Sequence, residues 1–172
     1  MRFFRPHITY NHYNDIDIKL LNRLNIITII VDIDNTLAVH YDTKPDKSAI
    51  EFINKLKNNG FNIFAMSNNT KERVSTFCKD LDIKGYHFSL KPLKRNYKKL
   101  IRENNIDNKV AIIGDQLLTD ILGGNRMKFT TIYTKPLVDK DIKWTKLNRI
   151  IEKVIIKRLN KNNLLEVGKY YE

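Results

Sequence analysis

The chain has 172 residues, of which 42% are apolar, and this size predicts a single domain around one substantial hydrophobic core. An excess of 31 Lys and Arg over 19 Asp and Glu gives a net charge of +12, which indicates either contact with a polyanion or a solvated basic surface on an enzyme. Cys78 is the only cysteine and no apolar run reaches the length of a membrane span, which excludes an intramolecular disulfide and a transmembrane segment and predicts a cytoplasmic protein.

Apolar runs typical of strands alternate along the chain with segments of helical period. In order, the pattern predicts a strand at 26–33, a helix at 45–60, a strand at 61–67, a helix at 68–81, a short strand at 86–90, a helix at 93–104, a strand at 109–115, a helix at 116–127, a strand at 130–134 and a helix from 142 to about 160. This alternation implies βαβ crossovers and hence an α/β fold of three layers, a Rossmann-like parallel sheet with helices on both faces. We expect residues 1–25 to form an N-terminal arm, residues 26–141 the core, and residues 142–172 a basic amphipathic helix and tail packed on that core.

Glycines and polar residues mark several expected helix ends. Gly60 is a favourable C-terminal stop for the first predicted helix of the core. Asn69, with Glu72 three residues later, has the pattern of a capped helix start. Gly123 and Gly124 indicate either a helix stop or a place where two backbones approach closely, and the sequence leaves both interpretations open.

The stretch IITIIVDIDNT, residues 26–36, reads as a buried strand that ends in the two carboxylates Asp32 and Asp34. An ionised carboxylate that leaves water costs several kcal/mol unless it is paired, hydrogen-bonded or bound to a metal. Parallel sheets place their ligand sites at the carboxyl ends of the strands. The residues that follow the other predicted strands would meet these carboxylates there, namely Ser67, Asn68, Asn69, Lys91 and Asp115.

Four carboxylates, Asp32, Asp34, Asp115 and Asp120, could not all stay ionised side by side without strong repulsion. A divalent cation is the simplest compensation, and hard oxygen ligands favour Mg²⁺, which takes one or two protein carboxylates together with a substrate phosphate. A carboxylate beside a metal, a second carboxylate, a hydroxyl and a lysine are together the parts of a phosphoryl-transfer site. The pattern therefore predicts Mg²⁺ as cofactor and a phosphorylated substrate.

Four short motifs resemble, in the right order, those of the haloacid dehalogenase (HAD) superfamily of phosphohydrolases: D-I-D-N-T at 32–36, S-N-N at 67–69, K-P at 91–92 and G-D-Q-L-L-T-D at 114–120. The longer string GDQLLTDILGGNR resembles more narrowly the YqeG-like branch of subclass IIIA, which includes mitochondrial phosphatidylglycerophosphate phosphatases. The resemblance covers roughly residues 26–135, and four ordered motifs are far more specific than any one of them. It implies an HAD-type fold and phosphomonoester hydrolysis.

The resemblance also implies catalytic roles. Asp32 would be the nucleophile that forms an aspartyl-phosphate, while Asp34 would protonate the leaving alcohol and then activate the hydrolytic water. Ser67 and the backbone that continues into Asn68 would bind the transferring phosphoryl group. Lys91 would bind the same group and offset its negative charge, so that Asp32, Asp34 and Lys91 are the expected catalytic residues.

The same resemblance implies a Mg²⁺ site. Asp32 and Asp115 would bind the metal through their carboxylates, and Asp34 through its backbone carbonyl. Asp120 would complete or orient the shell of metal ligands. Thr36 would fix the loop after the first strand rather than take part in the chemistry.

Each motif taken alone is also compatible with a purely structural role. A single D-x-D-x-T is typical of a strand end followed by an Asx-capped turn. Ser67 and Asn68 could simply cap the helix that follows them, and Lys91 could be a solvated charge in a lysine-rich neighbourhood. The order of all four motifs, not any single residue, favours an active enzyme.

The spacing of the motifs predicts that the core has no cap domain. Between Thr36 and Ser67 there are 30 residues, which a loop, a helix and a strand nearly fill. Between Asn69 and Lys91 there are 21, again enough only for a helix and a short strand. A site without a cap is open to solvent and suits a phosphate carried on something large, such as a protein, a nucleic acid or a lipid head group.

The predicted C-terminal helix is apolar on one side and basic on the other. Its apolar residues recur at helical spacing and are Trp144, Leu147, Ile150, Ile151, Val154, Ile155 and Leu159. Such a helix can lie on an anionic membrane, cover the second face of the sheet, or contact a partner or RNA. Contact with the membrane would make the protein peripheral on its inner face.

The leading functional hypothesis is a Mg²⁺-dependent phosphatase that converts phosphatidylglycerophosphate into phosphatidylglycerol. One alternative is the same enzyme acting on a soluble sugar phosphate or nucleotide. Another is a nucleic-acid or ribosome-associated binding module in which phosphatase activity is secondary or absent. Intact catalytic motifs argue against this last alternative, because a binding module has no evident need for Asp32 and Asp34 together.

Overall fold

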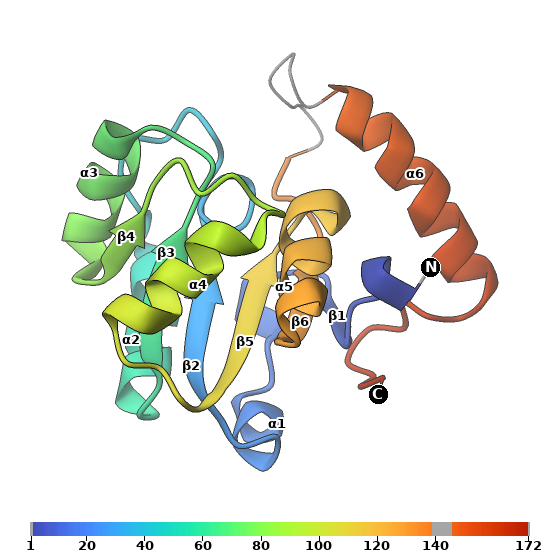
Figure 1. Ribbon diagram of the computed structural model, residues 1–172, viewed down its shortest axis with the longest axis horizontal. Helices are drawn as coiled ribbons and strands as arrows, with labels where there is room; N and C mark the ends of the chain where they lie inside the picture. The colour runs from blue at the N-terminus through green and yellow to red at the C-terminus, as the bar shows by residue number, and fades with distance from the viewer. Residues whose placement is uncertain (1, 139–145, 172) are drawn as a thin grey trace.

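Branched aliphatic residues form the two central strands, β2 (Ile26–Val31) and β5 (Lys109–Gly114), which pair in parallel in the computed structural model (Figure 1). The structure describes residues 2–138 and 146–171. The remaining strands are β1 (Ile8–Tyr10), β3 (Asn62–Met66), β4 (Lys84–Tyr86) and β6 (Thr130–Thr134). All pairings are parallel, in the order β1-β6-β5-β2-β3-β4, which confirms the predicted α/β fold.

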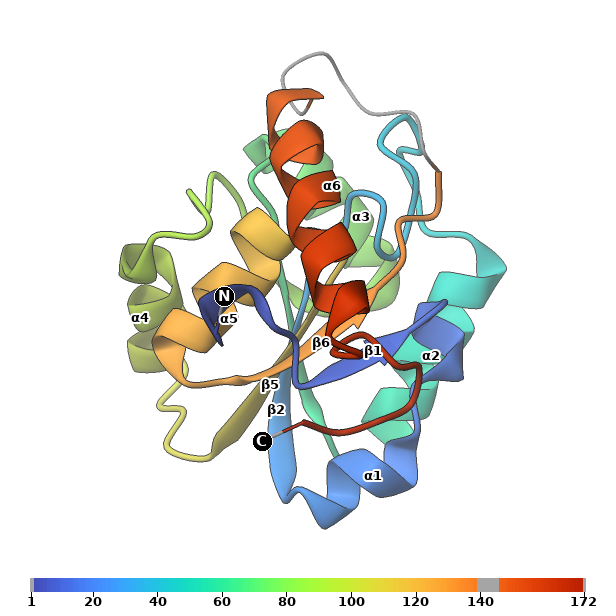
Figure 2. The same ribbon diagram turned by 90° about the vertical axis from the view of Figure 1, so that its right-hand side faces the viewer.

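Helices cover both faces of this sheet, as predicted; Figure 2 shows α4 and α5 on one side and α1 and α2 on the other. The α-helices are α1 (Ile18–Arg23), α2 (Lys47–Asn58), α3 (Lys71–Leu81), α4 (Lys94–Glu103), α5 (Leu122–Met127) and α6 (Lys146–Lys161). Shorter helical turns are η1 (Arg2–Phe4), η2 (Tyr13–Asp15) and the π-helix η3 (Leu117–Ile121). No cap domain interrupts residues 26–134, all of which the structure describes.

The core lies in layers on the two faces of the sheet because successive residues of a strand point to opposite sides. Ile29 and Val31 of β2 belong to the layer that contains the apolar side chains of α2 and α3. Ile30 points the other way and belongs to the layer with Tyr97 and Leu100 of α4. A strand buried on both faces is continuously apolar, and this is why its pattern was recognisable in the sequence.

The N-terminal segment is part of the sheet, in contrast to the arm expected for residues 1–25. Ile8 of β1 is fully buried and pairs with Ile132 of β6, so β1 is an edge strand. Tyr13 is also buried, and its hydroxyl donates a hydrogen bond of 3.0 Å to Ser48 in α2. A three-residue strand is too short to show an alternating pattern, and β1 therefore had no signal in the sequence.

The C-terminal segment returns to the edge of this strand. The backbone N–H of Gly168 donates to the carbonyl of Thr9 (2.8 Å), and the N–H of Tyr171 donates to the carbonyl of His7 (2.7 Å). Backbone groups on the outer side of β1 therefore have partners from the tail, which protects a short edge strand from pairing with another chain.

Helix α6 packs against η3, and its buried side chains belong to the same apolar cluster as Tyr133 of β6 (Figures 1 and 2). Its contacts use Ile155 and Leu159, while Ile150 and Val154 from the predicted apolar face are exposed. A cavity of about 730 Å³ lies between α6 and the β1–β6 edge of the sheet. The first residues of the predicted helix, 142–145, lie outside the described part of the chain. Among the described residues, no helix has both the length and the hydrophobicity to cross a bilayer.

Several local details differ from the expected ones. Gly60 has a φ of +84° directly after α2, as expected of a helix stop. Thr70, not Asn69, caps α3, since its hydroxyl accepts the N–H of Arg73. The short strand predicted at 86–90 is instead β4, which ends at Tyr86, and the helix predicted at 116–127 begins with the π-helix η3.

Gly124 lies within α5 and allows the helix to approach the sheet closely, which decides between the two interpretations of the glycine pair. A Cβ at this position would lie 2.4 Å from Cγ2 of Ile112 and 2.6 Å from Cγ2 of Thr131.

We expect Gly124→Ala to destabilise the protein by about 1–3 kcal/mol through overpacking, and thus to lower its Tm by several degrees. Thermal unfolding would measure this, with the exposed Lys98→Ala as a control that should change Tm little; equal Tm values for both variants would contradict the close approach.

Candidate active site

The predicted site residues meet at the carboxyl ends of the strands. Asp32 follows β2, Ser67 follows β3 and Asp115 follows β5. Lys91 comes from the segment between β4 and α4, and Asp120 comes from η3. The fold therefore brings together side chains that are up to 88 positions apart in the sequence because every one of these segments begins at the same edge of a parallel sheet.

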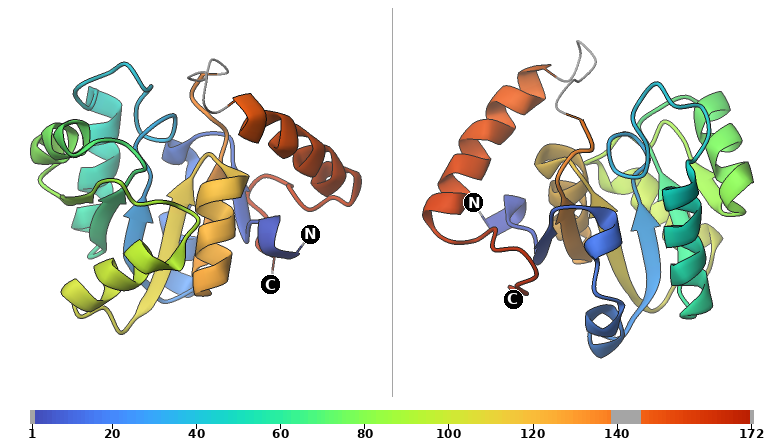
Figure 3. Two further views of the ribbon diagram at one scale, coloured as in Figure 1. Left: turned by 45° about the horizontal axis from the view of Figure 1, so that its top comes forward. Right: turned by 180° about the vertical axis from the view of Figure 1, so that it is seen from behind.

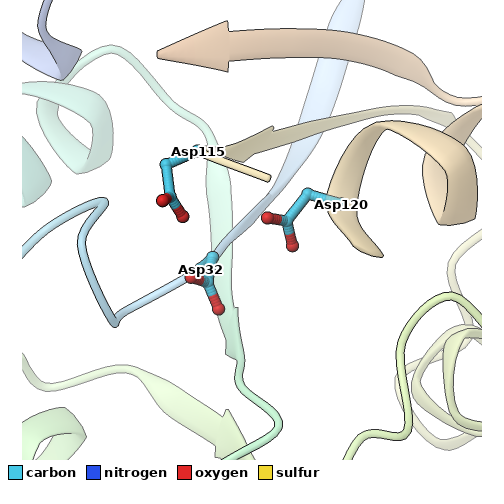
Figure 4. Close-up of side chains that lie close together, drawn as sticks. All are labelled: Asp32, Asp115 and Asp120. Atoms are coloured by element: carbon cyan, nitrogen blue, oxygen red, sulfur yellow. The ribbon is translucent and has the colours of Figure 1, made fainter. Parts of the chain in front are cut away.

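Three carboxylates, those of Asp32, Asp115 and Asp120, form the centre of the site (Figure 4). Each offers an oxygen, and these oxygens all lie within 4.8 Å of one another. All three side chains are buried, and so is Lys91, whose Nζ lies 2.5 Å from Asp32 Oδ1 and 2.6 Å from Asp120 Oδ1. One ammonium compensates one of three negative charges, so a divalent cation with a preference for oxygen ligands fits the remaining charge.

Asp120 reaches this centre because the chain turns tightly after β5. Its Oδ2 accepts the backbone N–H of Gln116 at 3.1 Å. Its carboxylate also lies directly against Gly114, where a Cβ would come within 2.3 Å of Asp120 Cγ. The glycine in the motif G-D-Q-L-L-T-D is thus required by the position of the last aspartate in the same motif.

Asp115 is joined to the loop after β2 by Thr36, whose hydroxyl donates to Asp115 Oδ1 over 3.3 Å. Both residues are buried, as is Asp32, whose N–H donates to the carbonyl of Ile113 at 2.9 Å and so extends the ladder between β2 and β5. These bonds fix the loop and the carboxylates relative to the central strands.

The carboxylate of Asp34 has different partners from the other three. Arg73 Nε lies 2.8 Å from Asp34 Oδ1, and Ser67 Oγ donates to Asp34 Oδ2 over 3.0 Å. The side-chain amide of Asn69 also donates to Asp34 Oδ2, at 3.2 Å. Asp34 thus lies outside the group of three carboxylates, and the expectation that it binds metal concerns only its backbone carbonyl.

Arg73, in the first turn of α3, is a site residue that the sequence did not indicate. Besides its ion pair with Asp34, its guanidinium donates to the carbonyls of Val39 and Asp42 in the loop after β2. It therefore holds Asp34 and this loop together. An arginine near a helix start in a chain with 31 basic residues carries no special signal, and only its proximity in the fold identifies it.

Asn68 uses its side chain to hold the main chain of Lys91. Its Oδ1 accepts the N–H of Lys91 at 2.8 Å, and its Nδ2 donates to the carbonyl of Lys91 at 3.3 Å. The expected contact of Asn68 with phosphate would therefore use its backbone. The amide side chain positions the lysine that neutralises the carboxylates.

The charges of the site shift each other's protonation equilibria. Burial raises the pKa of Asp32 well above its ordinary value; Lys91 opposes this effect, and the neighbouring carboxylates of Asp120, Asp115 and Asp34 add to it. Burial lowers the pKa of Lys91, but the carboxylates of Asp120 and Asp32 outweigh burial and raise it above its ordinary value. Lys91 thus stays charged and favours the ionised form of Asp32.

The family model described as mitochondrial PGP phosphatase matches residues 1–138 of this chain. The chain belongs to this family. A relative in Bacillus subtilis (strain 168), the probable phosphatase YqeG, is 31% identical over 166 residues, which are 96% of this chain and 96% of that protein. The protein is therefore an HAD-type phosphatase, and its resemblance to the YqeG-like branch is confirmed.

Solved structures of other proteins share this fold at low sequence identity. The cobalt-bound deoxy-D-mannose-octulosonate 8-phosphate phosphatase of Haemophilus influenzae is 16% identical, with a TM-score of 0.50, and the match covers 84% of this chain and 95% of that one. A hypothetical protein of Xanthomonas campestris is 14% identical, with a TM-score of 0.52 and coverage of 77% of this chain and 75% of that one. The shared architecture agrees with the observed parallel sheet.

The raised pKa of Asp32 predicts a dependence of stability on pH in metal-free protein. The folded state binds the Asp32 proton more tightly than the unfolded state. Protonation of Asp32 therefore contributes to the free energy of unfolding, fully below the ordinary pKa of 3.8, and this stabilisation is lost as the pH rises through the raised pKa. We expect Asp32→Asn to raise Tm in chelator at neutral pH, by about 2–4 °C for each kcal/mol of repulsion removed, and less near pH 4.

Thermal unfolding in chelator across this pH range would measure the effect, with the exposed Asp107→Asn as the matched control. Added Mg²⁺ should raise the Tm of the wild type and of Asp107→Asn more than that of Asp32→Asn, because binding to the folded state stabilises it. A lower Tm of Asp32→Asn than of the wild type at every pH would show that the ion pair with Lys91 outweighs the repulsion.

The contacts of Arg73 predict an effect on catalysis that is separate from metal binding. We expect Arg73→Met to lower kcat for a soluble chromogenic phosphomonoester by about 10²-fold, because Asp34 loses its ion pair and the loop after β2 loses two hydrogen bonds. The shift of Tm caused by Mg²⁺ should stay nearly unchanged. The exposed Arg158→Met is the control, and equal kcat values for the two variants would contradict a role of Arg73.

Proposed function

We propose that this protein hydrolyses the phosphomonoester of phosphatidylglycerophosphate and releases phosphatidylglycerol and phosphate. The match of residues 1–138 to the PGP phosphatase family supports this substrate. The observation that carries the proposed chemistry is the buried group of Asp32, Lys91, Asp115 and Asp120 at the open end of the sheet. It provides a nucleophile, a positive charge and oxygen ligands within one small volume.

In the first step, a carboxylate oxygen of Asp32 attacks the phosphorus atom. A bond between this oxygen and phosphorus forms while the bond between phosphorus and the glycerol oxygen breaks, which leaves an aspartyl-phosphate. Asp34 donates its proton to the departing alcohol and becomes a carboxylate. Arg73 stabilises the carboxylate produced by this transfer, because its guanidinium already lies 2.8 Å from Asp34 Oδ1.

In the second step, water attacks the phosphorus atom of the aspartyl-phosphate. Asp34 accepts a proton from this water, the bond between Asp32 and phosphorus breaks, and inorganic phosphate leaves. Asp32 returns to its carboxylate form, which the ion pair with Lys91 favours. Ser67 and the backbone that continues into Asn68 would hold the phosphoryl oxygens, a few residues before α3 begins.

The donor set fits a hard divalent cation, and we propose Mg²⁺ as the cofactor. The carboxylates of Asp32 and Asp115 and the backbone carbonyl of Asp34 would hold it, with Asp120 as a further oxygen donor or as a partner that orients the others. When bound, Mg²⁺ supplies positive charge that lowers the cost of bringing a phosphate dianion to these carboxylates.

An open site suits a substrate whose phosphate is part of a large assembly. No cap domain covers the carboxyl edge in the described residues, so a head group could reach Asp32 while its acyl chains stay in a bilayer. The net charge of +12 favours an anionic surface. We therefore place the protein in the cytoplasm, with peripheral contact to the inner face of the membrane.

The lipid substrate is tested by phosphate release from phosphatidylglycerophosphate in mixed micelles, with Mg²⁺ or chelator, beside soluble sugar phosphates and nucleotides. We expect the lipid to be the fastest substrate, chelator to abolish release, and Asp32→Asn to lower it by about 10³-fold or more. Asp107→Asn should keep the wild-type rate.

Two other results would contradict parts of this proposal. Faster release from soluble esters would leave the hydrolytic mechanism in place and remove the lipid as substrate. Absence of metal-dependent release, combined with RNA binding that weakens steeply with salt and persists in Asp32→Asn, would favour the nucleic-acid binding module.

A further inference from the structure

The segment between β4 and α4 exposes large apolar side chains beside the active site. Phe88, Leu90 and Leu93 are 53%, 56% and 52% exposed, respectively. Ser89 and Lys91, which alternate with them, are buried. The segment therefore contributes Lys91 to the active site and presents three apolar side chains to solvent.

The backbone of this segment is held in a conformation that favours this arrangement. Phe88 and Leu90 have φ values of +42° and +50°, in the left-handed region that side chains with a Cβ disfavour. The N–H of Phe88 donates to the carbonyl of Asn69 at 2.9 Å, and the N–H of Ser89 donates to the carbonyl of Ser67 at 3.1 Å. Such strain persists only where surrounding contacts fix it, and it is common at functional sites.

Exposed basic side chains follow the apolar ones along the chain. The helix α4 begins directly after Leu93, and its exposed basic residues are Lys94, Arg95, Lys98, Lys99 and Arg102. Tyr41, in the loop after β2, is also exposed. Figure 3 (left) brings forward the end of the sheet at which these two segments lie, the same end that carries the active site.

We propose that Phe88, Leu90 and Leu93, together with the basic face of α4, are the surface that docks this enzyme on an anionic phospholipid bilayer. The apolar side chains enter the boundary between head groups and acyl chains, and the basic ones pair with anionic head groups. Docking on this surface places the opening of the site at the membrane, next to the phosphate of a lipid substrate. This inference rests on the proposed lipid phosphatase function.

The composition of the surface favours a bilayer over other polyanions. A surface that binds nucleic acid uses basic residues but gains little from the aliphatic side chains of Leu90 and Leu93. Stacking of bases would require regularly placed aromatic rings. Helix α6 also exposes apolar residues, Ile150, Ile151 and Val154, and it packs on η3, which carries Asp120, but α6 itself contributes no side chain to the group of three carboxylates. The segment at 88–93 is the exposed apolar surface that is continuous with Lys91.

The test is co-sedimentation of full-length protein with vesicles of phosphatidylcholine alone and with added phosphatidylglycerol. The test variant is Phe88→Asn with Leu90→Asn, because asparagine tolerates the left-handed region better than either native residue and the fold should persist. We expect it to bind phosphatidylglycerol vesicles at least about tenfold more weakly than the wild type. Its turnover of a soluble phosphomonoester should stay within about twofold of the wild type, since both side chains are exposed to solvent whereas the charged groups of the site are buried.

Two control variants distinguish this surface from the rest of the protein's exterior. Lys128→Asn introduces asparagine at an exposed residue with a φ of +64°, between α5 and β6, and should bind vesicles like the wild type. Ile150→Asn with Val154→Asn removes the two most exposed apolar residues of α6 among those described and should also bind normally. Loss of vesicle binding in this α6 variant but not in the 88/90 variant would overturn the assignment.

The vesicles contain no phosphatidylglycerophosphate, so docking and catalysis can fail separately. Asp32→Asn should bind vesicles like the wild type, which supports docking without turnover. Vesicle binding that is absent in the wild type, or equal with and without phosphatidylglycerol, would overturn the inference even if micellar substrate is hydrolysed. Tight binding of RNA or of a protein through residues 88–93, without binding to vesicles, would overturn it as well.

Discussion

The buried charges at the end of the sheet are the constraint on which the rest of the structure depends. Three carboxylates and one ammonium lie together almost without access to water, with Lys91 between Asp32 and Asp120. Such a group is stable only if each member is held in position and the excess negative charge is matched by a ligand. The close turn at Gly114 and the bond from Thr36 to Asp115 meet the first condition.

Much of the fold could be predicted because its central strands are buried on both faces. Apolar runs rich in β-branched residues, such as 26–31 and 109–114, have few alternative structures, and the amphipathic helices between them fix the parallel order. The edge strand β1 could not be predicted, because three residues show no period and their pairing depends on β6, more than 120 positions away. Which apolar residues of α6 are covered was also not predictable, since this depends on the positions of η3 and of Tyr133 in the fold.

In the active site too, residues within motifs could be predicted from the sequence, whereas residues brought close only by the fold could not. The sequence indicated Asp32, Asp115, Asp120 and Lys91 because they occur in ordered motifs at strand ends, and the fold brings all four together. It could not indicate Arg73, whose importance comes only from its proximity to Asp34. A motif specifies the residue types that the chemistry needs, while the residues that hold them in place can come from any neighbouring segment.

The segment of residues 67–69 joins Asp34 to the segment that carries Lys91. Its side chains bind the Asp34 carboxylate and the main chain of Lys91, and its carbonyls hold residues 88 and 89. Under the proposed roles, a phosphate bound to this segment and a membrane bound to the neighbouring one would act on the same few hydrogen bonds. Thermodynamic linkage then requires reciprocity: whatever factor the membrane surface contributes to phosphate affinity, bound phosphate contributes equally to membrane affinity. An enzyme built in this way would remain longest on the membranes that contain its substrate.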